Sequence, residues 1–579
     1  MKKDGGMKKD KLEYLRTQSK QKFDLVRATW LEAGKWALPY STRYLKSQRD
    51  GERNNRHITD PTHTLSLRSC VAGFNEGNSS ATRPWFIIRT SGDSSGLSTN
   101  AKAWLQFFTD RCRRNLMISN FYHATPGFYY HYNVYNTGTY WIDELPTKLH
   151  FHLLIPGSYF ILNNSYGEAT TLVMERELTV RQIVDEYGEK DAKGNWDWSN
   201  FSDDLRGLYE SGDVTQKIVV VTTACENKHY DSTKPTAMLN KPWIIHTYET
   251  GSSGASGYDR DALGIDATFD MMNPANEGKY LRIEGRSRKP FVVGASPRNG
   301  NFEYGEMGPT TDSLGLIKSL NYKAIAKDQA IEQMLRPALQ GPANLNRSYI
   351  TSASNSFVPL DPTSAKPGGG LRSIFEINPA FGSLLQDQAD LRRMVDKFYY
   401  ADFLLFLSNN PKTRTAAEAN AIVQEQQTVI GPQLQSLNFT HNLPIVDYVM
   451  DYTLETDPEL PPIPEELQGQ FMRTEFISVF AQALKAADLP NIERYVAAMM
   501  AIAPLDPKVL QKVNTDKLAD LYEDRLYLPV GLNNPQDIVD ARREQQQAMA
   551  ARQQMIQEQL PAVAGAAKDL GVTAGRQQE

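Results

Sequence analysis

Cysteine is scarce in this chain: there are three in 579 residues, Cys70, Cys112 and Cys225. An odd number of widely spaced cysteines argues against a disulfide framework and against a cysteine-based zinc site. No apolar run approaches the roughly 18 residues that a membrane-spanning helix needs. The lysine-rich N-terminus is not followed by the apolar segment of a secretory signal. We therefore expect a folded protein of a reducing compartment, without a membrane segment.

Recognisable catalytic motifs are also missing. The fragment Gly278–Tyr280 is the nearest approach to a phosphate-binding Walker A loop, but it lacks the upstream glycine and the hydroxyl residue that binds Mg²⁺. The glycine–serine run 251–257 resembles a nucleophile elbow only superficially. His150 and His152 share one face of an expected strand and could form a metal pair, but no convincing third ligand is nearby. We therefore expect no enzymatic activity, no cofactor and no metal.

A strong net charge is absent as well, because the formal charge is only −5. Any contact with nucleic acid must therefore come from a local basic patch. Residues 1–56 carry 15 Lys or Arg against 7 Asp or Glu, whereas residues 445–470 carry seven acids and no base. This asymmetry is typical of surfaces that meet different partners, or simply of solvated surface.

The chain is long enough for two to four domains. Residues 7–50 have helical periodicity that Pro39 interrupts. Short β-branched and aromatic runs from about 140 to 245, with a hairpin signal at 163–167, predict an α+β domain. His131 lies in an aromatic segment whose spacing is more typical of a helix core than of base stacking. Weak periodicity at 251–300 predicts a long surface loop.

Two long helices are expected to flank a loop-rich block at 340–378. The second is expected to run from about Phe381 to Leu407 and to end in a basic break that contains Lys412 and Arg414. If subunits form a ring, each adds one such loop to a central opening, which suits a nucleic-acid backbone. The alternative is an ordinary helix connection with two solvated cations.

Short motifs spread over residues 12–547 occur in the order found in one known family. They include Leu38-Pro39-Tyr40, Thr59-Asp60-Pro61, Arg83-Pro84-Trp85-Phe86, Pro156-Gly157-Ser158-Tyr159, Tyr304-Gly305, Gly308-Pro309, Thr415-Ala416-Ala417-Glu418, Gly431-Pro432 and Leu460-Pro461-Pro462-Ile463-Pro464. By these motifs the chain resembles the portal, or head-to-tail connector, proteins of short-tailed bacteriophages of the podovirus type. Two departures are Glu306-Met307, where relatives often carry an arginine, and Arg414, where they are often apolar.

The resemblance implies a helix-rich α+β portal fold assembled as a ring, typically a dodecamer in this family. The implied regions are a wing at 1–310 with a loop-rich insertion at 251–300, a first stem helix at 311–339, a clip at 340–378, a second stem helix at 379–407, a channel loop at 408–414, the second part of the wing at 415–504, and a crown with the C-terminal tail at 505–579.

The resemblance also implies a function: a DNA channel at one capsid vertex of the virion, through which the genome is packaged and ejected. Implied partners are double-stranded DNA, the terminase large subunit, tail adaptor and tail proteins, major capsid and scaffolding proteins, and internal ejection proteins, with assembly in the host bacterial cytoplasm. The alternatives are a tail adaptor or other virion structural protein, and a metal-dependent nucleic-acid-processing enzyme.

In a channel of this kind, scattered cations would hold DNA weakly enough for it to slide. The candidates are Lys412, Arg414, Lys323, Lys327, Arg393 and Lys397. The last four form two pairs at i,i+4 spacing on the expected stem helices. Ion pairing within or between subunits, with neighbours such as Asp328 or Asp390, is the alternative role for those four.

Overall fold

The structure is a computed structural model. It describes residues 9–46, 54–90, 97–190, 194–228, 230–231, 233, 240–250, 280–298, 303–335, 339–342, 357–360, 372–373, 381–401, 429–477, 489–502, 518, 542–549 and 551–552. The chain divides into two compact units. The first takes in Met1–Trp85, Arg111–Pro458 and Ser478–Phe480, and the second takes in Phe86–Asp110, Glu459–Ile477 and Ala481–Glu579.

Helix α1 (Lys9–Ala37) begins the first unit, and buried aromatic side chains fix its position. Phe23 and Trp30 both pack edge-on against the buried ring of Tyr304, with ring centroids 5.7 and 5.2 Å away. The helix ends just before Pro39, as the sequence predicts, because proline lacks the N–H group that a continuing helix needs. A short 3₁₀ turn, η1 (Pro39–Ser41), follows.

A five-stranded antiparallel sheet lies beside α1. Its strands in spatial order are β4 (Tyr159–Asn163), β5 (Ala169–Thr179), β6 (Lys217–Glu226), β7 (Trp243–Glu249) and β8 (Arg282–Arg286). The β-branched runs of the sequence predicted the first four, which are confirmed. The hairpin signal at 163–167 is confirmed too, since Gly167 takes φ +81° in the turn between β4 and β5.

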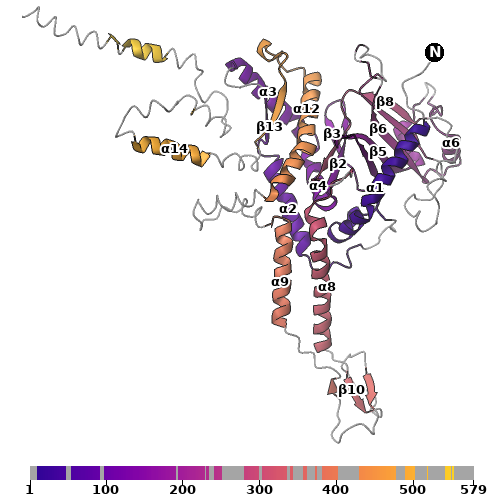
Figure 1. Ribbon diagram of the computed structural model, residues 1–579. Helices are drawn as coiled ribbons and strands as arrows, with labels where there is room; N and C mark the ends of the chain where they lie inside the picture. The colour runs from indigo at the N-terminus through magenta and orange to yellow at the C-terminus, as the bar shows by residue number, and fades with distance from the viewer. Residues whose placement is uncertain are drawn as a thin grey trace, which may run out of the picture. The chain divides into compact units, whose positions relative to one another are not determined.

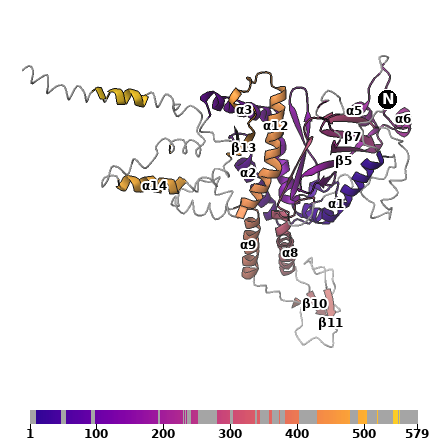
Figure 2. The same cartoon turned by 45° about the horizontal axis from the view of Figure 1, so that its top comes forward.

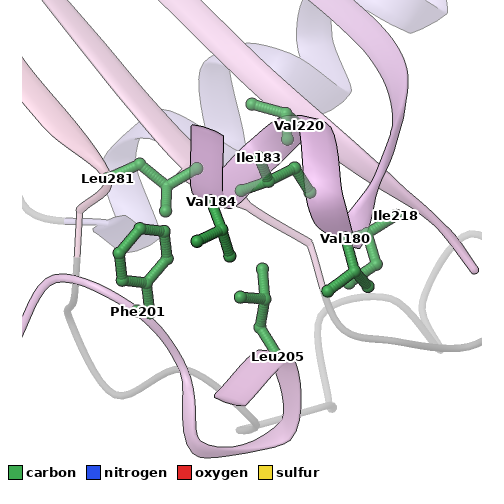
Figure 3. Packing of buried hydrophobic residues seen from close by; sticks show 8 residues of the cluster. All are labelled: Val180, Ile183, Val184, Phe201, Leu205, Ile218, Val220 and Leu281. Carbon is green, nitrogen blue, oxygen red and sulfur yellow. The ribbon is translucent and has the colours of Figure 1, made fainter. Parts of the chain in front are cut away.

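One part of this sheet carries a small core of its own. Helix α5 (Val180–Tyr187) starts at a capping box formed by Thr179 and Gln182. Together with α6 (Asp203–Glu210) it places apolar side chains against β6. Figure 3 shows these buried side chains pointing toward one another: Val180, Ile183, Val184, Phe201, Leu205, Ile218, Val220 and Leu281.

A second sheet has the order β3-β2-β9, with β2 (Thr137–Glu144) in the centre, β3 (Leu149–Leu153) on one side and β9 (Phe291–Ala295) on the other. The predicted surface loop at 251–300 is therefore wrong for its last part, because β8 and β9 lie there and β9 is buried throughout. Pairing with β7 and β2, both distant in sequence, stabilises these strands despite weak periodicity. Residues 251–279 lie outside the described part of the chain.

Aromatic side chains fill the space between helices and this second sheet. Helix α4 (Phe121–Tyr135) packs on α2 (Thr62–Asn78) and on β2. Phe128 of α4 stacks on His441, with centroids 3.8 Å apart. His441 belongs to a π-helical turn, η5 (Asn438–Asn442), which leads into α12 (Leu443–Thr456). Burial lowers the pKa of His131 to about 4, so this histidine is a core residue, as its spacing predicted.

Helices α8 (Pro309–Leu335) and α9 (Phe381–Phe398) lie side by side and antiparallel (Figures 1 and 2). The two predicted stem helices exist, and the first ends earlier than expected, because Leu339 already belongs to a strand. Helix α9 is interrupted after Phe398, where Tyr400 takes a left-handed backbone at φ +54°, and Ala401 is helical again. Residues 402–407 lie outside the described residues.

Between α8 and α9 in the sequence come three short strands: β10 (Leu339–Pro342), β11 (Phe357–Leu360) and β12 (Arg372–Ser373). They form a sheet in the order β11-β10-β12, with β11 parallel and β12 antiparallel to the central strand. The loop-rich block expected at 340–378 thus contains strand pairing in the parts that are described.

The second unit contains the antiparallel pair β1 (Phe86–Thr90) and β13 (Met472–Phe476) and the first part of α3 (Thr99–Ile118). The indole of Trp104 donates to the carbonyl of Pro461 at 3.0 Å, which ties α3 to the proline-rich segment that precedes η6 (Glu465–Leu467). Helix α14 (Leu489–Ile502) and residues 542–549 agree with the helical C-terminal part that the sequence predicts. Across the described residues, no helix combines the length and hydropathy that a membrane crossing requires.

Candidate nucleic-acid interface

Six cations are the sequence's candidates for contact with DNA: Lys412, Arg414, Lys323, Lys327, Arg393 and Lys397. The first two lie outside the described residues. The two lysines of α8 lie one helical turn apart, and so do the two cations of α9. Because α8 and α9 are adjacent, the structure brings all four onto one helix pair.

The α8 lysines differ in their surroundings. Lys323 forms an ion pair with Asp387 of α9, which ties the two helices together. An exposed pair of this kind contributes about 0–1 kcal/mol and leaves the lysine less available to a phosphate. Lys327 is half-buried, and no ion pair to it occurs among the described residues. The alternative of ion pairing is therefore realised for Lys323, within one chain.

The α9 cations lie on the exposed face of their helix. The side chain of Arg393 is 77% exposed and forms an ion pair with Asp390 on the same helix at 3.3 Å, so the alternative of ion pairing is realised here too. Its neighbour Arg392 turns the other way and donates to Asp60 Oδ2 from Nε at 3.2 Å and from Nη2 at 2.8 Å. Lys397, one turn after Arg393, is exposed. Arg393 and Lys397 thus place two exposed cations one helical turn apart on α9, and we call this pair the cationic stripe.

This stripe can attract an anion at low cost. The Arg393–Asp390 pair is exposed, so little free energy is lost when a phosphate replaces the carboxylate. Positive charge along a helix attracts a nucleic-acid backbone without reading its sequence. Chemically, the arrangement can hold a polyanion loosely.

Buried polar residues fix the opposite side of α9. Asp60, which is 3% exposed, accepts hydrogen bonds from the Thr62 amide at 2.9 Å and from Arg392. Burial opposes ionisation of Asp60, but the hydrogen bonds from Thr62 and Arg392 outweigh it, so the pKa of Asp60 lies below its ordinary value. In the sequence, Thr59-Asp60-Pro61 stands out only as one of the family's short motifs, and nothing in that motif points to this anchor.

Large apolar side chains are also exposed on the same two helices: Tyr322, Ile325, Met334 and Leu335 of α8, and Leu385 and Met394 of α9. Tyr322 and Leu335 are 74 and 77% exposed. Exposed apolar residues are typical of surfaces that contact another protein where they form a contiguous patch.

His150 and His152, the pair considered as a metal site, contact each other, and His152 also contacts the carboxylate of Asp143. The rings of His150 and His152 lie 4.3 Å apart, and His152 Nε2 lies 3.1 Å from Asp143. Asp143 also accepts from Arg286 at 3.0 Å. Despite partial burial, the hydrogen bonds from His152 and Arg286 hold the pKa of Asp143 well below its usual range. Among the described residues, no group of three or more potential ligands is arranged to hold a metal ion.

Comparison with known proteins gives one family. The chain matches the family described as bacteriophage head to tail connecting protein over residues 9–263 and 266–532. It is 30% identical over 536 residues to the probable portal protein of Bordetella phage BPP-1, covering 90% of this chain and 89% of that protein. It is 27% identical over 529 residues to the portal protein of Salmonella phage epsilon15, covering 90 and 88%.

Among solved structures, the chain is similar to one from the virion of a native gene transfer agent particle. That likeness has a TM-score of 0.33 at 10% identity and covers 78% of this chain and 92% of the other. At this score it adds nothing to the assignment, which rests on the match of 9–263 and 266–532 and on the two phage relatives. The chain therefore belongs to the family of bacteriophage head-to-tail connecting proteins.

Proposed function

We propose that copies of this protein assemble into a ring, a dodecamer, that forms the portal channel at one vertex of a phage capsid. Double-stranded DNA enters and leaves through the channel during packaging and ejection. The observation that carries the proposal is the α8–α9 pair, which combines exposed apolar side chains with the cationic stripe of Arg393 and Lys397. Neighbouring copies cover the apolar side chains, and DNA supplies the anion.

The regions keep the boundaries that the sequence suggested. We assign residues 1–310 and 415–504 to the wing, 311–339 and 379–407 to the stem, 340–378 to the clip, 408–414 to the channel loop and 505–579 to the crown and tail. In this scheme α8 and α9 are the described parts of the stem.

The same proposal names the partners. The clip docks the terminase large subunit during packaging and the tail adaptor afterwards, and the wing meets the major capsid and scaffolding proteins. The ring is a component of the virion and catalyses nothing itself, because the terminase supplies the ATP-driven force. The two phage relatives support this assignment, because one is a portal protein and the other a probable portal protein.

Weak contact with DNA is part of the proposed mechanism. A channel must let the duplex slide, so one or two cations per subunit are better suited to it than a dense basic patch. Lys412 and Arg414 of the channel loop and Arg393 and Lys397 of the stem are the proposed contacts. Lys327 is a further candidate, whereas Lys323 is engaged with Asp387.

Negative-stain electron microscopy of the purified full-length protein tests the assembly. We expect class averages of rings with a central hole. If the protein is found only as monomers at concentrations where rings should form, the ring and the channel are both overturned.

A second experiment tests the channel loop. Lys412 and Arg414 are changed together to glutamine, and packaged DNA length and DNA retention are measured in particles. We expect normal rings with reduced retention, because two phosphate-attracting charges per subunit are lost. If ring formation, packaged DNA length and DNA retention are all unchanged, the loop has no part in the mechanism.

A further inference from the structure

Polar side chains occupy a place where packed helices usually bury apolar ones. The place is the junction of α8 and α9 with the segment Thr59–Ser66, which leads into α2, and we call it the stem joint. Asn321 of α8 is 0% exposed and Gln388 of α9 is 1% exposed. Burying such groups costs free energy unless each finds hydrogen-bond partners.

Asn321 is fully engaged in the stem joint. Its side-chain oxygen accepts from the backbone N–H groups of Thr59 at 2.7 Å and Asp60 at 2.9 Å. Its amide nitrogen donates to the carbonyl of Ile317 at 2.8 Å. This side chain therefore ties α8 to the segment that opens α2.

Helix α9 has ties of its own to the same segment. Arg392 binds Asp60 at 2.8 Å, and Ser66 donates from its hydroxyl to Asp396 at 2.5 Å. Each stem helix thus has polar contacts of its own to this segment, beside buried apolar residues such as Leu320 of α8 and Val395 of α9. Hydrogen bonds of this kind can exchange partners, whereas an interdigitated apolar layer resists displacement.

Gln388 is the exception in this layer. It precedes Arg392 by one turn of α9 and follows Asp387, which pairs with Lys323 of α8, so it lies at the level of the stem joint. Neither Oε1 nor Nε2 of Gln388 has a hydrogen-bond partner within the described residues, although both atoms are buried. A buried unpaired amide is costly, and an apolar side chain of the same shape would avoid that cost.

We propose that the stem joint has two positions and that Gln388 is the spare partner for the second. When the α8–α9 pair shifts against Thr59–Ser66, the side-chain oxygen of Gln388 takes over the N–H groups of Thr59 and Asp60 that Asn321 releases. The two side chains carry the same carboxamide group, so either can satisfy these donors. Arg392 keeps Asp60 in both positions because its side chain is long and partly exposed.

The function of the second position rests on the proposed portal channel. A joint at the base of the stem helices lets the channel wall move while the wing stays in place, and a bistable polar layer confines the wall to two discrete settings. Gln388 is in this sense a positioning residue, because it acts through Thr59 and Asp60 and does not touch DNA.

Hydrogen exchange of the Thr59 and Asp60 amides in the assembled, full-length protein tests the exchange of partners. Asn321→Ala removes the present partner, and Gln388→Met removes the spare one. We expect both amides to stay protected in Asn321→Ala and to lose protection by about tenfold in the double variant, the loss of one hydrogen bond each. Asn321→Ala combined with Gln433→Met is the control, since Gln433 is also buried with an unpartnered Oε1 but lies outside the joint.

Thermal unfolding of the single variant Gln388→Met gives a test that is independent of hydrogen exchange. We expect its midpoint to rise by a few degrees, because the unpaired amide is replaced by an apolar side chain of similar shape. Particles should then form normal rings but package less DNA. A lowered midpoint, or amides that Asn321→Ala alone exposes as fully as the double variant, would overturn the two-position joint. Absence of rings in the unaltered protein would instead overturn the channel, so the two failures are distinguishable.

Discussion

Arg392 and Arg393 are consecutive in the sequence and have opposite roles in the structure. Arg392 is tied to the buried carboxylate of Asp60, whereas Arg393 projects from the other face of α9. Successive residues of an α-helix point about 100° apart, so one arginine can anchor the helix while the next remains available to a ligand. At the residue scale, the role of each arginine therefore depends on the side chain that it contacts and not on the residue type.

Asp60→Asn tests the anchor. The change keeps an acceptor for Thr62 but removes the charge that Arg392 binds, and we expect the free energy of unfolding to fall by about 1–3 kcal/mol at pH 7. The pKa of Asp60 is lowered by folding, so its contribution is present above the ordinary carboxyl pKa and is lost as pH falls through the folded-state value. Denaturant titrations at pH 7 and pH 3 measure the difference. Asp390→Asn, at an exposed pair, is the control, and equal effects of both changes would contradict the anchor.

Glu175→Gln tests a deeper ion pair between α1 and β5. Glu175 is buried and lies 2.7 Å from both Arg16 and Lys20. Burial alone would raise the pKa of Glu175, but the charges of Arg16 and Lys20 outweigh burial and lower it to about 2. The substitution removes one of the two carboxylates that pair with buried Arg16 and leaves Glu13, 3.0 Å away on the same helix. We therefore expect a loss of about 3 kcal/mol at pH 7, the low end for a broken buried pair.

The pH dependence of that loss in stability is a second test of the ion pair. Glu175 stabilises the fold above its unfolded-state pKa, and this stabilisation disappears as pH falls toward about 2. The unaltered protein and Glu175→Gln should therefore converge in stability at acid pH. Glu210→Gln, at the exposed pair with Arg206, should stay close to the unaltered protein throughout. A constant gap at all pH values would show that packing, and not charge, causes the loss.

At the scale of elements, close backbone approach decides where α8 begins. The backbone from Tyr304 to Gly308 wraps around Asn136, whose side-chain amide donates to the Glu306 carbonyl at 2.8 Å. A Cβ at Gly308 would lie 1.9 Å from Asn136 Oδ1, and one at Gly305 would lie 2.1 Å from the Asn136 carbonyl oxygen. The glycines are thus required by space, and they set the position from which the helix starts.

A pair of glycine substitutions tests this requirement. We expect Gly308→Ala to destabilise the protein by about 1–3 kcal/mol, because Asn136 must move from its place. Gly315→Ala lies within α8, where nothing occupies the position of the new Cβ, so it should stabilise the fold by about 0.5–1 kcal/mol. Thermal unfolding of the two variants measures both shifts. Shifts of the same sign would show that space around Asn136 is not limiting.

Element ends are also where local sequence was misleading. The apolar run after Phe398 predicts a continuous helix to Leu407, yet Tyr400 turns into the left-handed region. The hydroxyl of Tyr399 lies 2.8 Å from that of Thr310 at the start of α8, and both residues are buried. Tertiary contacts with α8 therefore override helix propensity at this point.

At the scale of the whole molecule, local positive charge is exposed although the net charge is negative. The net charge is −5, yet Arg393 and Lys397 present positive charge on one exposed helix face. In an assembled ring this stripe would repeat once per subunit. Attraction of this kind is electrostatic and independent of base sequence, so it should weaken as salt concentration rises.

Arg393→Gln with Lys397→Gln tests the stripe in particles. We expect unchanged ring formation, reduced DNA retention and a weaker dependence of retention on salt, since each lost phosphate contact lowers the salt slope by about 1. Arg181→Gln with Arg206→Gln is the matched control, because those two arginines are exposed and form comparable i,i+4 pairs on α5 and α6. Equal losses in both double variants would mean that overall charge, and not the stripe, holds the DNA.

The sequence by itself determined most elements of the first unit. The end of α1 before Pro39, the strands β4 to β7 and the turn at Gly167 follow from local signals: proline, β-branched runs and a glycine with positive φ. Each signal acts within a few residues, so it can be recognised without knowing what lies across the fold. The two stem helices and the four described cations also follow from spacing along the chain.

Only the tertiary structure decided which side chains meet. Strands β8 and β9 form because β7 and β2 accept them, and α9 ends where Tyr399 reaches α8. The tertiary structure likewise separates Arg392 from Arg393, engages Lys323 with Asp387, and leaves the amide of Gln388 buried without a described partner. These outcomes depend on residues far apart in the chain, and periodicity along the chain carries no information about the partner across it.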